Sequence, residues 1–176
     1  PLFETTRAIA ASGGEFGIAV VAGRNQELRE RLVAQDWPVP TFVYGFERRM
    51  PEMMRAATIL VTKAGPGTIT EAINAGLPMV LYSRVPGQED GNVAYVVEEG
   101  VGLWAPGAEK TAGAVRDWLK EPERIEKAAA ACRRIARPGA ALEIAGFIAA
   151  AASGAVPVRD SEAARWDVAA SRQHTA

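Results

Sequence analysis

The segment TILVTKAGPGTITEAINAGLPMVLYS, residues 58–83, decides the fold class of this chain. It begins with an apolar, β-branched run at 58–63 that is typical of a buried strand. A glycine-proline-glycine corner then leads into a helical pattern at 67–76, which Gly76 and the Leu-Pro after it should end. A second apolar run follows at 78–83. Strand, helix and strand in this order predict a βαβ unit with parallel strands.

The same alternation continues on both sides of this unit. It predicts an α/β fold, a Rossmann-like parallel sheet flanked by helices on both faces. The chain also begins, at Pro1, in a stretch typical of a helix already under way. Further strands are expected at 16–23, 41–46 and 101–106, and further helices at 25–36, 48–57 and 88–100, with two or three more from about 110 to 152.

Parallel sheets of this kind bind ligands in the loops that follow the carboxyl ends of their strands. Four loops of this chain, each directly after an expected strand, should therefore lie along one edge. These loops span 23–25, 45–48, 63–68 and 83–90.

Composition excludes several classes of protein. The 20 basic and 21 acidic side chains give a net charge of −1, which is not the footprint of a nucleic-acid binder. The single cysteine, Cys132, excludes an intramolecular disulfide and a cysteine-cluster zinc site, and we expect it to pack in a helix. The single histidine, His174, lies in the tail, so a Ser-His-Asp site is not expected.

The length of 176 residues fits one domain with a tail. We assign residues 1–152 to a Rossmann-like domain and residues 153–176 to a C-terminal helix or polar tail. The most apolar stretch, 144–152, is too short to span a bilayer and is expected to form a buried, alanine-rich helix.

The corner at 63–68 is the first candidate binding site. The start of a helix carries unpaired N–H groups and partial positive charge, and glycines allow a phosphate to approach them. Gly65, Gly67 and Thr68 are therefore candidate phosphate ligands, and Lys63 could add charge. The alternative is an ordinary tight turn between a strand and a helix, because the corner is not a Walker A loop and lacks a Gly-x-Gly-x-x-Gly fingerprint.

Two further groups of polar residues each have a functional and a structural interpretation. Glu71 fits a capping box with Thr68, and it equally fits a carboxylate that accepts from the hydroxyls of a ribose. Gln88, Glu89 and Asn92 carry the donors and acceptors that a sugar requires, or they are ordinary polar residues at a helix start.

The pattern TKAGPGT…EA…G.P…PGQE.GN..YV within residues 59–102 closely resembles the C-terminal half of monogalactosyldiacylglycerol synthases and related diacylglycerol glucosyltransferases, MurG-like enzymes with the GT-B fold. The stretches AVVAGRNQELRE and VYGFERRMPEMM are similar to the same family. The resemblance covers roughly residues 1–150, and it implies a piece of a longer protein whose N-terminal half binds the acceptor and supplies the catalytic base.

The resemblance also implies roles for individual residues. It places the donor diphosphate at Gly65, Gly67 and Thr68, the ribose at Glu71, and the uracil beside Phe46. The donor sugar would face Gln88, Glu89 and Asn92. Positions at the cleft without an assigned role are Arg24, Asn25, Lys63 and Pro66.

The implied reaction is transfer of a hexose from UDP-galactose or UDP-glucose to diacylglycerol, with no metal and no other cofactor. The implied location is cytoplasmic and peripheral at the membrane in the full-length protein, and no catalytic residue is expected in this chain. Two alternatives stay open: a UDP-sugar epimerase, which would usually carry a histidine in its cleft, and a donor-binding subunit that a separate membrane partner completes.

Overall fold

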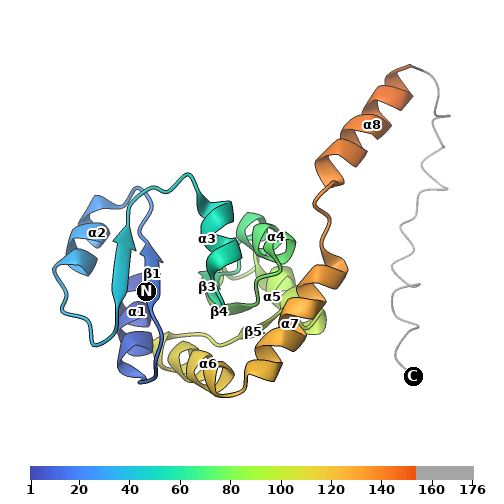
Figure 1. Ribbon diagram of the computed structural model, residues 1–176. Helices are drawn as coiled ribbons and strands as arrows, with labels where there is room; N and C mark the ends of the chain where they lie inside the picture. The colour runs from blue at the N-terminus through green and yellow to red at the C-terminus, as the bar shows by residue number, and fades with distance from the viewer. Residues whose placement is uncertain (154–176) are drawn as a thin grey trace. The chain divides into compact units, whose positions relative to one another are not determined.

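The computed structural model describes residues 1–153 of the chain. The alternation of strands and helices that the sequence predicts is confirmed, with each element within a few residues of its expected bounds (Figure 1). The elements in chain order are α1 (Leu2–Ala11), β1 (Ile18–Val21), α2 (Gln26–Val33), β2 (Thr41–Tyr44), α3 (Met50–Ala56), β3 (Leu60–Lys63), α4 (Pro66–Ala75), β4 (Met79–Ser83), α5 (Asp90–Glu98), β5 (Gly102–Trp104), α6 (Ala108–Lys120), α7 (Pro122–Ile135) and α8 (Ala140–Ala152).

All strand pairs are parallel, as predicted, but the hydrogen bonds divide them between two sheets. β1 pairs with β2, with Ile18 opposite Thr41, and a three-stranded sheet has the order β3-β4-β5. The expectation of one continuous sheet is therefore corrected. Side chains still join the two sheets, because Ile18 of β1 and Val61 of β3 pack against the same apolar cluster.

Helices cover both faces of the three-stranded sheet, and strand β4 shows why. Its fully buried Met79 and Leu81 belong to a cluster with residues of α3, α4, α5 and α7. Val80, between them, points to the opposite face and packs with residues of α1 and α6. Because successive side chains of a strand alternate between faces, a continuous apolar run is what a strand buried on both faces requires.

Close packing of α5 on the sheet depends on Gly102 in β5. A Cβ at this position would lie 2.4 Å from the carbonyl oxygen of Met79 and 2.7 Å from a methyl carbon of Val96. No real side chain fits at such distances. Gly76, by contrast, ends α4 in the left-handed conformation with φ 71°, as its sequence predicts.

The chain divides into two compact units, residues 1–136 and a second unit beginning at Arg137. In the second unit, α8 buries none of its residues, and Leu142 is 80% exposed, so the expected buried helix is wrong. The stretch Pro122–Ala152, which contains α7 and α8, is long and apolar enough to cross a membrane. Length and composition alone are weak evidence for a membrane-spanning helix. The predicted element at 153–176 lies almost entirely outside the described residues.

Candidate functional site

The first turn of α4 presents unpaired N–H groups at the end of β3. Gly65 is the N-cap and no side chain caps the helix. The N–H of Ile69 is bonded to the carbonyl oxygen of Gly65 at 3.1 Å. Pro66, which has no N–H, is the first helical residue, so the N–H groups of Gly67 and Thr68 precede the first intrahelical bond. These two donors share the partial positive charge of the helix start.

Neither the neighbouring protein atoms nor the backbone conformation requires a glycine at position 67. A Cβ built there would meet nothing within 4 Å, and the backbone does not adopt a positive φ. A glycine in a helix costs up to about 1 kcal/mol relative to alanine. An open, side-chain-free approach to two unpaired N–H groups has the geometry that a bound anion needs.

The capping-box interpretation of Glu71 is wrong. Because α4 begins at Pro66, Thr68 lies inside the first turn and Gly65 occupies the cap position. Glu71 is exposed, and none of the hydrogen bonds or ion pairs of the described residues involves its carboxylate. It is therefore a free acceptor one turn away from the unpaired N–H groups.

The loop between β4 and α5 is joined to this corner by two side chains. The amide of Asn92 donates to the carbonyl oxygen of Ala64 at 2.9 Å. The Nζ of Lys63 lies 3.5 Å from Oε1 of Glu89, whose Oε2 accepts from the N–H of Val85 at 2.8 Å. Both loops after β3 and β4 therefore meet at one edge, as the topology predicts.

The predicted sugar ligands differ in their surroundings. Glu89 is only 4% exposed, with both carboxylate oxygens engaged, and the side-chain amide of Asn92 is committed to Ala64. Gln88 is exposed and its side chain takes no part in the hydrogen bonds of the described residues. Of these three residues, Gln88 is the one whose side chain has no hydrogen bond among the described residues.

The loops after β1 and β2 form a second pair. The guanidinium carbon of Arg24 lies 4.9 Å from the ring centre of Phe46, which is 61% exposed. Asn25 caps α2, because its side chain accepts a hydrogen bond from the N–H of Leu28 at 2.9 Å. The structure thus brings an exposed aromatic ring and a guanidinium group together at the ends of these two strands.

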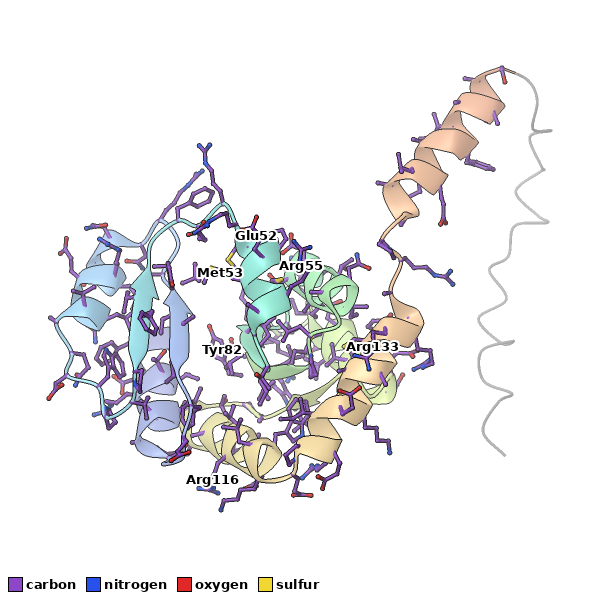
Figure 2. The ribbon with its side chains drawn as sticks, in the orientation of Figure 1. Glu52, Met53, Arg55, Tyr82, Arg116 and Arg133 are labelled. Atoms are coloured by element: carbon purple, nitrogen blue, oxygen red, sulfur yellow. The ribbon has the colours of Figure 1, made fainter. Side chains whose placement is uncertain are left out.

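The position of Tyr82, near the carboxyl end of β4, is one that the sequence does not predict. Burial raises the pKa of its phenol, although a hydrogen bond with Ser83 and the charge of Lys63 act in the opposite direction. Figure 2 shows Tyr82 on the side of β4 that faces β1 and β2. Glu52 and Arg55, which are also labelled there, are exposed residues of α3. An aromatic residue inside an apolar run gives no sequence signal of this position.

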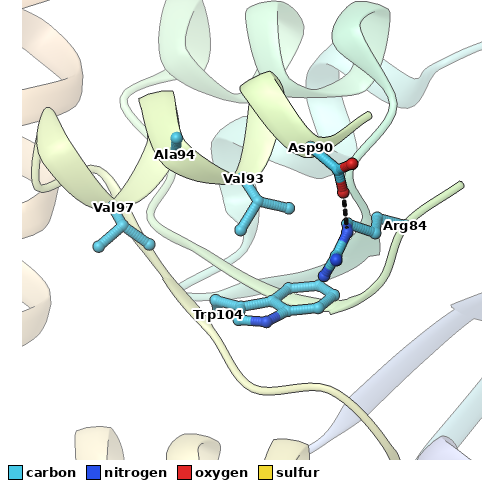
Figure 3. Close-up of a pocket in the computed structure, with 6 residues that line it drawn as sticks. All are labelled: Arg84, Asp90, Val93, Ala94, Val97 and Trp104. Atoms are coloured by element: carbon cyan, nitrogen blue, oxygen red, sulfur yellow. Dashed lines mark hydrogen bonds and ion pairs between the residues drawn. The ribbon is translucent and has the colours of Figure 1, made fainter. Parts of the chain in front are cut away.

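A second missed feature is an open hollow of about 440 Å³ beside α5 (Figure 3). Arg84 stacks over the ring of Trp104, with 5.1 Å from its guanidinium carbon to the ring centre, and forms an ion pair with Asp90. The N–H of Gly87 and then Arg84 lower the pKa of the Asp90 carboxyl. None of the residues that line this hollow is a predicted donor ligand; they are Arg84, Asp90, Val93, Ala94, Val97 and Trp104.

Comparison with known proteins decides the family. The family model of the glycosyltransferase family 28 C-terminal domain matches residues 6–139, more than half of the chain. The chain belongs to this family. Within the family, the match extends from α1 to the residues just beyond α7 and includes the whole of the α4 corner.

Monogalactosyldiacylglycerol synthases are among its relatives, which confirms the resemblance found in the sequence. Monogalactosyldiacylglycerol synthase 2, chloroplastic, of Arabidopsis thaliana is 41% identical over 128 residues, which are 72% of this chain and 27% of the relative. Monogalactosyldiacylglycerol synthase 1, chloroplastic, of the same plant is 38% identical over 152 residues, covering 82% of the chain and 28% of the relative. The chain thus spans less than a third of these relatives' length.

Solved structures agree on the fold. MurG of Acinetobacter baumannii superposes with a TM-score of 0.69 at 18% identity, over 84% of this chain and 45% of that one. The spinosyn rhamnosyltransferase SpnG, in complex with thymidine diphosphate, superposes with a TM-score of 0.57 at 16% identity, over 83% and 40%. This family domain therefore has the α/β fold of one half of a GT-B glycosyltransferase.

Proposed function

We propose that this chain is the donor-binding half of a UDP-sugar-dependent glycosyltransferase that transfers a hexose, galactose or glucose, to diacylglycerol. Family membership and identities of about 40% to monogalactosyldiacylglycerol synthases support the reaction class. Because the chain spans less than a third of these relatives, the acceptor site and the catalytic base belong to the remaining part of the protein.

One observation carries the proposal: the unpaired N–H groups of Gly67 and Thr68 stand beside the free carboxylate of Glu71. The N–H groups suit the diphosphate of UDP and would stabilise the charge that grows on it as it leaves the sugar. A carboxylate forms strong hydrogen bonds with the two hydroxyls of a ribose. Among residues 1–153, no hydrogen bond or ion pair occupies any of these groups.

The proposal includes donor binding without a metal ion. Backbone N–H groups and the Lys63 ammonium supply the positive charge that Mg²⁺ supplies elsewhere. UDP affinity should therefore be the same in Mg²⁺ and in excess EDTA. A loss of binding in EDTA that Mg²⁺ restores would refute this part of the proposal.

Isothermal titration of the chain with UDP, ADP and free ribose tests donor recognition. We expect millimolar or tighter affinity for UDP, weaker affinity for ADP and no measurable affinity for ribose. No transfer of hexose should occur with the chain alone. Absence of UDP binding to a folded sample would refute the proposed function, and isomerisation of a UDP-hexose by the longer protein would favour an epimerase.

We extend the proposal to a peripheral position at a membrane in the full-length protein, because diacylglycerol is a bilayer lipid. The relatives are named chloroplastic enzymes, and these names do not support a cytoplasmic location. The cytoplasmic location therefore stays a prediction. Co-sedimentation of the full-length protein with vesicles that contain diacylglycerol tests this part, and a protein that stays in the supernatant contradicts it.

A further inference from the structure

The ion pair between Lys63 and Glu89 lies directly over the start of α4. A Cβ built on Gly65, the N-cap, would come within 3.8 Å of Cε of Lys63 and 4.0 Å of Oε1 of Glu89. Both charged groups are therefore next to the helix terminus proposed to hold the diphosphate. The pair connects residues 26 positions apart, at the end of β3 and at the N-cap of α5.

The two partners of this pair have unequal alternatives. The side chain of Glu89 is 6% exposed, and its other oxygen is bound to the N–H of Val85. The side chain of Lys63 is 59% exposed, and its ammonium group has this one carboxylate as a partner among the described residues. The carboxylate is held in place by the loop, whereas the ammonium group can leave.

The contact between them is long for a charged hydrogen bond. It measures 3.5 Å, compared with about 2.7–2.9 Å for a strong ammonium–carboxylate bond. A pair with one well-exposed member contributes little to stability. A diphosphate on the N–H groups of Gly67 and Thr68 carries more negative charge than one carboxylate and would attract the Lys63 ammonium strongly.

We propose that Lys63 exchanges its partner when the donor binds: its ammonium group moves from Glu89 to the diphosphate, and Oε1 of Glu89 is then free to accept a hydrogen bond from a hydroxyl of the hexose. The inference rests on the proposed function. The exchange couples two parts of one site, since Oε1 of Glu89 becomes available to the hexose only after the diphosphate has arrived.

The exchange also makes the affinity for the substrate, a UDP-hexose, differ from the affinity for the product, UDP. With a UDP-hexose, a sugar hydroxyl replaces the ammonium group at the buried carboxylate. With UDP, that carboxylate oxygen is left without a partner, which is costly for a buried charge. UDP therefore binds less tightly than the UDP-hexose, and the return of Lys63 to Glu89 favours its release.

Titration of three variants with UDP and UDP-galactose tests the exchange. Lys63→Met should weaken UDP binding about tenfold or more, the effect of losing one hydrogen bond to a charged group. Glu89→Gln should strengthen UDP binding, because Lys63 no longer leaves an anion unpaired. In the double variant, Glu89→Gln should have no such effect. The matched control is Lys110→Met, an exposed lysine of α6, which should bind like the unmodified chain.

The sign of the Glu89→Gln effect decides between exchange and a static role. If Glu89 only held Lys63 in position, Glu89→Gln would weaken UDP binding, and this result overturns the proposal. So does an unchanged affinity in Lys63→Met. If the unmodified chain binds UDP and Gly67→Ala weakens that binding while these variants behave otherwise than expected, the exchange is wrong and the donor site stands. If UDP does not bind at all, both fail.

A measurement on the unmodified chain covers the case in which Glu89→Gln does not fold. The ¹³C signal of the Glu89 carboxyl carbon should shift when UDP is added and shift again with UDP-galactose. A carboxyl signal that stays in place during a titration that moves the amide signals of Gly67 and Thr68 overturns the exchange.

Discussion

The side-chain amide of Asn92 donates to the carbonyl oxygen of Ala64 at 2.9 Å, and so connects the start of α5 with the corner at 63–68. Ala64 is fully buried, so its carbonyl depends on this donor for an interaction away from water. A residue that resembles a sugar ligand in sequence is therefore also part of the support of the diphosphate site.

Asn92→Ala should lower the free energy of unfolding by about 1–3 kcal/mol, because it leaves a buried acceptor without a partner. It should also weaken UDP binding, since the α4 corner loses a support. Thermal unfolding and UDP titration measure the two effects. An unchanged melting temperature would show that the bond to Ala64 contributes nothing.

Gly67→Ala should separate binding from stability. The new methyl group meets no protein atom within 4 Å, and alanine favours a helix over glycine by up to about 1 kcal/mol, so stability should stay equal or rise. UDP affinity should fall about tenfold or more, because the methyl group occupies the approach to the N–H groups. Thermal unfolding and titration with UDP measure both.

Gly102→Ala is the matched control for this variant. Its methyl group would lie 2.4 Å from the carbonyl oxygen of Met79, so this variant should unfold at a much lower temperature or fail to fold. Equal UDP affinity of Gly67→Ala and the unmodified chain would contradict the phosphate cradle.

Glu71→Gln should weaken UDP binding by about 1.5–3 kcal/mol, the contribution of a hydrogen bond to a charged group. It should leave the melting temperature unchanged, because Glu71 is exposed and has no partner among the described residues. Glu98→Gln, an exposed glutamate of α5, should alter neither quantity. Weaker binding of UDP by both variants to the same extent would indicate a general charge effect and contradict a ribose contact.

Phe46→Ala should weaken binding of UDP by about 1 kcal/mol and leave binding of pyrophosphate unchanged, because only UDP carries a base to stack on the ring. Phe42→Ala is a matched control, since both rings are 61% exposed. Equal losses for UDP and pyrophosphate in Phe46→Ala would contradict a position beside the base.

Cys132 should resist thiol reagents in the folded protein. Its thiol is fully buried near the carbonyl oxygens of Leu77 and Val101, and burial raises its pKa to about 11. Since the folded pKa lies above the ordinary value of 9.0, its contribution to stability is present below pH 9 and is lost as the pH rises towards 11. Rapid modification of the native protein at pH 8 would contradict this burial.

The sequence predicts the fold of the first unit well because the signals are local. Apolar runs such as residues 78–83 and the glycine that ends α4 report their own strand or helix end. Separation of the strands into two sheets could not be predicted, because it depends on hydrogen bonds between distant segments. The exposure of Leu142 and its neighbours was also missed, since apolar composition does not say whether a partner surface is present.

The candidate site, too, could be predicted from the sequence only in part. The α4 corner and the four loops could be located from their order in the chain. The commitment of Asn92 to Ala64 and the pairing of Lys63 with Glu89 could not, because both join loops nearly thirty residues apart. Arg24 had no predicted role, and the structure places it over Phe46.

Amide chemical shifts during a titration with UDP test the central claim most directly. If the start of α4 holds the diphosphate, the largest shifts should fall on the N–H groups of Gly67 and Thr68, with smaller ones around Glu71, and Gly67→Ala should reduce them at the same UDP concentration. Saturable UDP binding that leaves the Gly67 and Thr68 signals in place would contradict the account.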